Sequence, residues 1–167
     1  MNEKYIFSDT TYFIYDLELE IDLKSDIKTE KKYQFYEEGR VLAQAHYFKD
    51  LLHGPSRFFF EDGSLLAISY FFLGKKQGKS FKYYQNNQVY SQEKFKDGSF
   101  HLDQNYFYEN GVLKSKLFYQ FGKLNKAFLY YDSGNIKRST IYENDTIISD
   151  DLFDIENKPI DQNIFKL

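Results

Sequence analysis

Three histidines and several groups of carboxylates are the residues in this chain that could support catalysis or metal binding. His46 and His53 are separated by an expected turn, and His101 lies far from both of them in the sequence. No His-x-x-x-His or Glu-His spacing suited to a metal occurs, and the chain has no cysteine to supply a thiolate ligand or nucleophile. We therefore expect the histidines to be structural, with no metal and no cofactor.

Acidic residues recur just before expected turns, at Glu37-Glu38, Glu61-Asp62, Glu109 and Asp132. A glycosidase would need two carboxylates in a cleft, one of them with a raised pKa. Carboxylates that recur at turns are instead expected to accept hydrogen bonds from turn amides. The acidic stretch between Asp150 and Glu156 lacks the glycine and the ligand spacing of a calcium loop.

The segment Gly74–Ser80 is superficially similar to a phosphate-binding loop. That motif needs four residues between its first glycine and the Gly-Lys-Ser/Thr triplet, and here Gly78 follows Gly74 by four positions, not five. No helix is expected after it. The sequence therefore predicts that this chain is not an enzyme.

Two sets of residues are better suited to binding a protein. The first is an aromatic row expected on one sheet face, where tyrosines are favoured in interfaces: Tyr36, Phe60, Tyr84, Tyr108 and Tyr131. The alternative is that other side chains or a second copy cover these rings, or that they form cross-strand pairs.

The second set is acidic and lies within residues 14–23. Leu17, Leu19, Ile21 and Leu23 alternate there with the carboxylates Asp16, Glu18, Glu20 and Asp22. Because side chains alternate between the faces of a strand, a slip of one residue would place four carboxylates in the core. We expect one continuous strand that caps the N-terminal edge of the fold and presents four carboxylates to a basic partner.

The aromatic row belongs to a pattern that occurs five times. In each copy two adjacent aromatic residues precede a turn residue, and an aliphatic residue follows two positions after it. The turn residues are spaced 24, 24, 24 and 23 apart, at Gly39, Gly63, Asn87, Gly111 and Gly134. A second turn follows eleven positions later, at Asp50, Gly74, Gly98, Gly122 and Asp145. A fixed period of this length is typical of repeat architectures, and the spacing within it predicts one β-hairpin per copy.

A further glycine stands fifteen positions after the turn residue in the first two copies, at Gly54 and Gly78. The later copies have Leu102, Lys126 and Ser149 at this position.

The repeated unit resembles the bacterial variant of the MORN repeat. The residues that carry the resemblance are the aromatic pair, the turn glycine, the aliphatic residue and the Gly-Lys turns at Leu73–Gly78 and Phe121–Lys123. It covers about residues 33–150, and it departs from the family pattern at Asn87 and at residues 97–102. The resemblance implies an elongated, single-layer antiparallel sheet of stacked β-hairpins. It also implies an antitoxin-like binding protein or a structural or membrane-proximal scaffold.

Composition agrees with an all-β fold in one domain-sized chain. Of the 167 residues 20% are aromatic, with 18 Phe and 16 Tyr, and these residue types favour strands. We expect N-terminal capping strands over residues 1–32, five repeats over residues 33–150, and a degenerate sixth repeat with a tail over residues 151–167. The tail to Leu167 is expected to be a short helix or a disordered end.

Charge and hydropathy narrow the expected partners. The net charge is −3 and the lysines are dispersed, so strong nucleic-acid binding is not expected. No apolar run approaches 18 residues and no signal peptide opens the chain, so we expect a cytoplasmic protein without a membrane span. The sequence predicts a non-enzymatic protein-binding module, with a bacterial or phage antitoxin or inhibitor of a basic effector as the leading hypothesis. A scaffold is the alternative, and homo-oligomerisation is left open.

Overall fold

The computed structural model describes residues 3–8 and 10–161, and within these residues all regular elements are β-strands. Their bounds are β1 Glu3–Phe7, β2 Tyr12–Asp16, β3 Ile21–Ser25, β4 Glu30–Phe35, β5 Val41–Phe48, β6 Leu51–Phe59, β7 Leu65–Phe72, β8 Lys75–Tyr83, β9 Val89–Lys96, β10 Ser99–Phe100, β11 Leu102–Phe107, β12 Leu113–Gln120, β13 Lys123–Tyr130, β14 Ile136–Glu143 and β15 Thr146–Leu152. The expectation for the tail beyond residue 161 lies outside the described residues.

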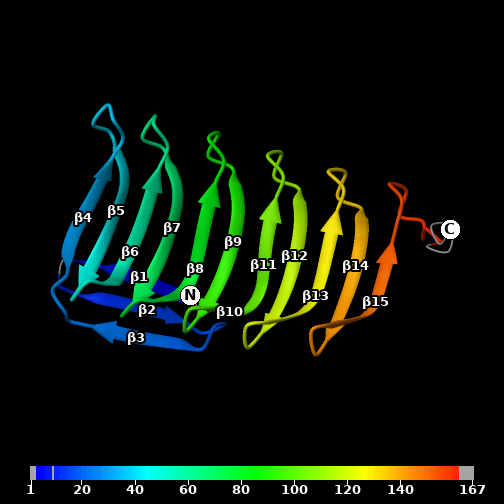
Figure 1. The fold of residues 1–167 in the computed structure, drawn as a ribbon, viewed down its shortest axis with the longest axis horizontal. Coiled ribbons are helices and arrows are strands. Elements are labelled where there is room, and N and C mark those ends of the chain that lie inside the picture. Colours follow the sequence, from blue (N-terminus) through cyan, green and yellow to red (C-terminus); the bar gives the residue numbers. More distant parts are fainter. Residues whose placement is uncertain (1–2, 9, 162–167) are drawn as a thin grey trace.

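Strands β4 to β15 form one open antiparallel sheet of consecutive hairpins, which we call the array (Figure 1). Each strand pairs with the strands before and after it, and the short β10 pairs only with β9. The prediction of an elongated single-layer sheet of stacked hairpins is confirmed. A sheet of this kind follows from the sequence because each copy carries two turn signals separated by strand-forming residues.

The two sets of turns adopt the backbone conformations that their residue types favour. At the first turn of each copy the turn residue has a positive φ, including Asn87 with φ 66°, so asparagine takes the place of glycine in the third copy. At the second turn both central residues have positive φ, for example Asn144 and Asp145 with 49° and 62°. Such two-residue connections match the right-handed twist of the strands that they join.

The first turn occurs a sixth time after β15. Asp154 accepts a hydrogen bond from Asn157 and donates one to Lys158, as Tyr36 does with Gly39 and Arg40 in the first copy. Asn157 has φ 65°. The assignment of residues 151–167 to a degenerate sixth repeat, like the other domain boundaries, remains a proposal.

A second, three-stranded sheet with the order β1-β2-β3 packs across one end of the array, and we call it the cap sheet. In Figure 1 its strands cross the lower ends of the first array strands, while the hairpins from β12 onward extend beyond it. Its buried residues Tyr12, Ile14, Leu19 and Ile21 form the core of the molecule. The expectation of one continuous strand over residues 14–23 at the array's edge is therefore wrong.

The continuous strand is interrupted by a turn at residues 17–20. The Asp16 carboxylate accepts a hydrogen bond from the Leu19 amide at 3.2 Å, and Glu20 has φ 53°. Leu17 is consequently exposed while Leu19 is fully buried. The apolar–acidic alternation thus spans two strands and the turn between them.

Gly54 and Gly78 lie where the cap sheet touches the array. A Cβ atom on Gly54 would lie 2.7 Å from the Phe7 ring, and one on Gly78 would lie 2.6 Å from the Tyr5 ring. At the equivalent position of the third repeat, Leu102 packs against the edge of the cap sheet's core. The glycines therefore mark the part of the array that the cap sheet covers.

Candidate functional site

The residue seven positions after each first turn points toward the cap sheet in the first three repeats. His46 packs on the Phe7 ring with centroids 4.2 Å apart, and Tyr70 packs on the Tyr5 ring at 4.9 Å. In the third repeat Lys94 binds Glu18 of the cap sheet at 2.5 Å. We call this side of the array the cap-side face.

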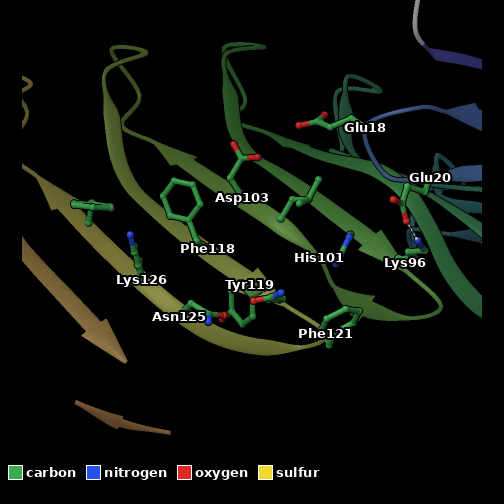
Figure 2. Close-up of a pocket in the computed structure, with 13 residues that line it drawn as sticks. Glu18, Glu20, Lys96, His101, Asp103, Phe118, Tyr119, Phe121, Asn125 and Lys126 are labelled. Atoms are coloured by element: carbon green, nitrogen blue, oxygen red, sulfur yellow. Dashed lines mark hydrogen bonds and ion pairs between the residues drawn. The ribbon is translucent and has the colours of Figure 1, made fainter. Parts of the chain in front are cut away.

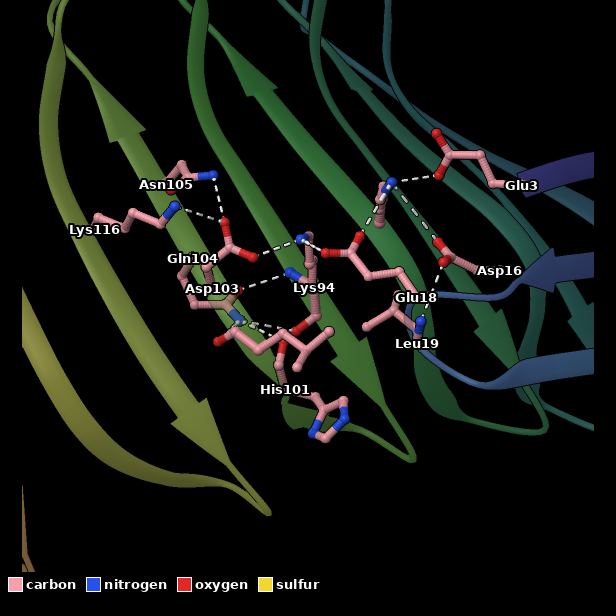
Figure 3. Close-up of polar contacts among 12 residues, drawn as sticks. Glu3, Asp16, Glu18, Leu19, Lys94, His101, Asp103, Gln104, Asn105 and Lys116 are labelled. Carbon is pink, nitrogen blue, oxygen red and sulfur yellow. Dashed lines mark hydrogen bonds and ion pairs between the residues drawn. The ribbon is translucent and has the colours of Figure 1, made fainter. Parts of the chain in front are cut away.

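Three lysines of the cap-side face hold the cap sheet through its carboxylates, and Figure 3 shows one of them, Lys94, between Glu18 and Asp103. Lys79 pairs with Glu3 and lies 3.9 Å from Asp16, and Lys96 binds Glu20 at 2.8 Å. Lys94 lies between Glu18 of the cap sheet and Asp103 of β11, at 2.5 Å from each. We call these lysines and their carboxylate partners the latch.

Burial and ion pairing shift the pKa values at the centre of the latch in opposite directions. Burial favours the neutral form of Lys94, but the hydrogen bonds that its ammonium donates to Asp103 and Glu18 outweigh burial and raise the Lys94 pKa. Burial also opposes ionisation of Asp103, yet the Lys94 ammonium lowers the Asp103 pKa to about 2. Both groups are therefore charged at neutral pH.

Beyond the latch, the cap-side face continues without a cover and is hollowed into a trough of about 850 Å³. One end of the trough is the cap-sheet turn with Glu18 and Glu20 (Figure 2). Its other lining residues include Leu102, Asp103, Phe118, Phe121, Lys126 and Phe128. A hollow of this size is within the range of ligand-binding sites.

Lysine and phenylalanine alternate on the two strands beneath the trough. Phe118 of β12 faces Lys126 of β13, and Lys116 of β12 faces Phe128 of β13. The two phenylalanine rings meet edge to face, with centroids 6.1 Å apart. Lys116 lies over the Phe118 ring and 3.5 Å from Asp103, whereas Lys126 has no ion pair with any described residue. The β12–β13 end of the trough therefore combines an aromatic floor with one lysine, Lys126, that is not neutralised, while Glu18, Glu20 and Asp103 line the part nearer the cap sheet.

The carboxylates predicted to bind a partner are placed mainly toward the array. Asp16 is buried and accepts a hydrogen bond from the Tyr5 hydroxyl at 2.8 Å, while Glu18 and Glu20 belong to the latch. Asp22 is exposed and faces Tyr15 on the other side of the cap sheet. The four carboxylates do not form one face, because the turn at residues 17–20 separates them. A role in partner binding stays a prediction for them.

The predicted aromatic row has an internal role in the structure. All five rings are half-buried, and each tyrosine hydroxyl donates a hydrogen bond of 2.7–2.9 Å to a backbone carbonyl of the next repeat. The four pairs are Tyr36 with Phe59, Tyr84 with Phe107, Tyr108 with Tyr130, and Tyr131 with Phe153. These bonds tie adjacent hairpins together. Binding of a partner by this row also stays a prediction.

The histidines do not come together as a metal site. His46 and His53 are buried beneath the cap sheet, and His101 lies beside the trough. Within residues 3–8 and 10–161 no group of three histidine or acidic side chains is arranged to hold a metal ion. Sequence reasoning missed the trough residues Phe118, Lys126 and Phe128. The available signal was the replacement of the glycine fifteen positions after the turn by Leu102 and Lys126.

The described part of the chain contains no helix that is long and apolar enough to span a membrane. No curated protein is similar to the chain in sequence. A family model, the MORN repeat variant, matches residues 52–72, 76–97 and 100–121. These matches coincide with three successive hairpins of the array, β6–β7, β8–β9 and β11–β12. MORN repeats are generally non-catalytic, and they are associated with scaffolds that bind proteins or membranes. Three hairpins of the array, including the one that carries Phe118, thus match the MORN repeat variant.

Proposed function

We propose that this chain is a non-catalytic scaffold that holds a partner protein on the uncovered part of its cap-side face. One observation carries the proposal. The position that contacts the cap sheet in three repeats, as His46, Tyr70 and Lys94, continues in the fourth repeat as Phe118, which faces the trough. The array therefore has a binding face longer than the cap sheet that occupies it.

The structure gives less support to an inhibitor of a basic effector. That hypothesis depended on a row of free carboxylates, and Asp16, Glu18 and Glu20 instead contact groups within the chain. A scaffold is favoured because the exposed feature is an aromatic trough beside the latch.

Site-specific photo-crosslinking in native cells tests the proposal. A photoreactive residue at Phe128 should crosslink to a defined partner protein. The same residue at Phe58 should not, because Phe58 lies on the other face of the array and is 43% exposed. Equal crosslinking from both positions, or none from Phe128, would contradict the proposal.

A further inference from the structure

We infer that the trough binds an extended, acidic segment of a partner protein, with carboxylate and aromatic side chains alternating along one face of that segment. The inference rests on the proposed function and adds the chemistry of the partner. It follows from how the chain binds its own cap sheet and from the charges that this leaves unmatched.

The cap sheet shows what chemistry the cap-side face accepts. Alternate residues of β1 point to the same face of the strand, and Glu3, Tyr5 and Phe7 all meet the array. Glu3 pairs with Lys79, Tyr5 packs on Tyr70, and Phe7 packs on His46. One strand thus binds through a carboxylate and two aromatic rings at every second residue.

The lysines of the cap-side face are neutralised unevenly. On β8 and β9 the carboxylates of the cap sheet pair with Lys79, Lys94 and Lys96. On β12, Lys116 pairs with Asp103, which also pairs with Lys94, and on β13 Lys126 has no ion pair among the described residues. Around the trough, Lys94, Lys96 and Lys116 share the three carboxylates Glu18, Glu20 and Asp103, so the positive charge of Lys126 on β13 is left without a carboxylate among the described residues. This uncompensated charge favours an acidic group at the β12–β13 end of the trough.

Two Lys–Phe pairs on β12 and β13 indicate how that partner would present its side chains. The pairs are Phe118 with Lys126 and Lys116 with Phe128. Each lysine lies beside a phenylalanine on the neighbouring strand. A matching segment places carboxylates and aromatic rings on the same face, so they occur at alternate residues, as in β1. The lining of the trough runs from Lys96 on β9 to Lys126 on β13, which is three strand spacings of about 4.8 Å, or about 14 Å in all, and about four extended residues would cover this distance at about 3.3 Å each.

The observations favour protein over nucleic acid. Neutralising phosphates requires several cations along a backbone, whereas the trough is lined by two lysines, Lys96 and Lys126, and by three carboxylates, Glu18, Glu20 and Asp103. The carboxylates would repel a phosphate backbone that continued past the trough toward the cap sheet.

The test uses the full-length chain and a fluorescein-labelled peptide, Glu-Ser-Phe-Ser-Glu-Ser-Phe, whose Glu and Phe side chains share one face when extended. We expect saturable binding by fluorescence anisotropy that weakens as salt is added. The Lys126→Glu variant should weaken binding at least tenfold. The matched control Lys31→Glu should not, because Lys31 is an exposed lysine on β4 at the other end of the array. A Phe128→Ala variant should also weaken binding, and circular dichroism should confirm that each variant is folded.

Three results would overturn the inference. They are no binding of the acidic peptide, equal or tighter binding of the same peptide with Lys in place of Glu, and equal loss of affinity in the Lys31→Glu and Lys126→Glu variants. Binding of a ten-residue oligothymidine that depends on Lys126, without binding of the peptide, would assign the trough to nucleic acid instead. A partner that crosslinks at Phe128 while the peptide fails to bind would leave the scaffold function standing and refute only the acidic chemistry.

Discussion

Replacing Gly78 by alanine tests whether the cap sheet is seated on the array as the structure shows. The new Cβ atom would lie 2.6 Å from two atoms of the Tyr5 side chain, so the ring must move. The Tyr5 hydroxyl donates a hydrogen bond to Asp16 at 2.8 Å and accepts one from the Lys79 amide at 3.0 Å. Displacing the ring would therefore weaken two hydrogen bonds as well as the packing on Tyr70.

The size of the effect follows from these contacts. Alanine at the positive φ of Gly78 costs about 1–2 kcal/mol in backbone strain. Loss of two hydrogen bonds adds about 0.5–1.5 kcal/mol each. We expect Gly78→Ala to lower the free energy of unfolding by about 2–5 kcal/mol, measured by urea denaturation.

Gly63 provides the matched control. It also has a positive φ, 87°, but no atom lies within 4 Å of an added Cβ. Gly63→Ala should therefore show only the strain of about 1–2 kcal/mol. In a Tyr5→Ala background, where the ring is gone, Gly78→Ala should cost no more than Gly63→Ala. If the two glycine variants are equally destabilised in the wild-type background, the reasoning about the cap sheet is refuted.

Three further predictions concern the latch and two buried rings of the array, His53 and Phe95. Lys94→Met should lower the free energy of unfolding by about 1–2 kcal/mol. This range is the free energy that corresponds to the lowered pKa of Asp103, reduced because solvent screens the Lys94–Asp103 pair. Because the pKa of Asp103 is lower in the folded state than in the unfolded state, the contribution of Asp103 to stability is present above about pH 4 and is lost as the pH falls through about 2. Urea denaturation of the Lys94→Met variant at a series of pH values should not show this loss. Burial lowers the pKa of His53, so wild-type stability should fall as the pH drops below about 6.5, and a His53→Phe variant should show a smaller fall over the same range. Phe95→Ala should cost about 3–5 kcal/mol because its ring is 8% exposed and packs on Phe100, while Phe121→Ala, at 83% exposure, should change stability by less than about 0.5 kcal/mol; similar losses for the two would contradict this assignment.

The array could be predicted from the sequence because its turns are local. Asn87 and the turn glycines need positive φ, and these residue types tolerate it whatever lies around them. Once five turns recur at a fixed spacing, hairpin pairing between neighbours follows with few alternatives. Fold class and turn positions thus depend on information present within each copy.

The turn in the cap sheet was missed because its signal is weak. Residues 17–20 are Leu-Glu-Leu-Glu, with no glycine, proline or asparagine to mark a turn. The local device is the Asp16 side chain, which accepts a hydrogen bond from the Leu19 amide. Aspartate within an alternating pattern is equally consistent with a strand, so the sequence alone favoured the wrong alternative.

The internal role of the tyrosine row was missed for a different reason. Alternation along a strand indicates which face a ring occupies, but not what its hydroxyl contacts in the next repeat. The four bonds from these hydroxyls join residues 22 or 23 positions apart, close to the repeat length. Phe60 has no hydroxyl to make such a bond, so one copy of the five lacks this link to the next repeat.

The extent of the cap sheet explains why part of the binding face is open. A strand of five residues spans about 17 Å, whereas the array's eleven successively paired strands span ten spacings of about 4.8 Å, or about 48 Å. One short sheet can therefore cover only part of the array, and its contacts run from His46 on β5 to Leu102 on β11. The residue fifteen positions after each first turn differs between the covered part and the open part of this face. Glycine is required where the Phe7 and Tyr5 rings rest on the backbone, and beyond the cap sheet the same position accepts Lys126. The side chains that replace those glycines therefore separate the part of the face that binds the chain itself from the part left for another molecule.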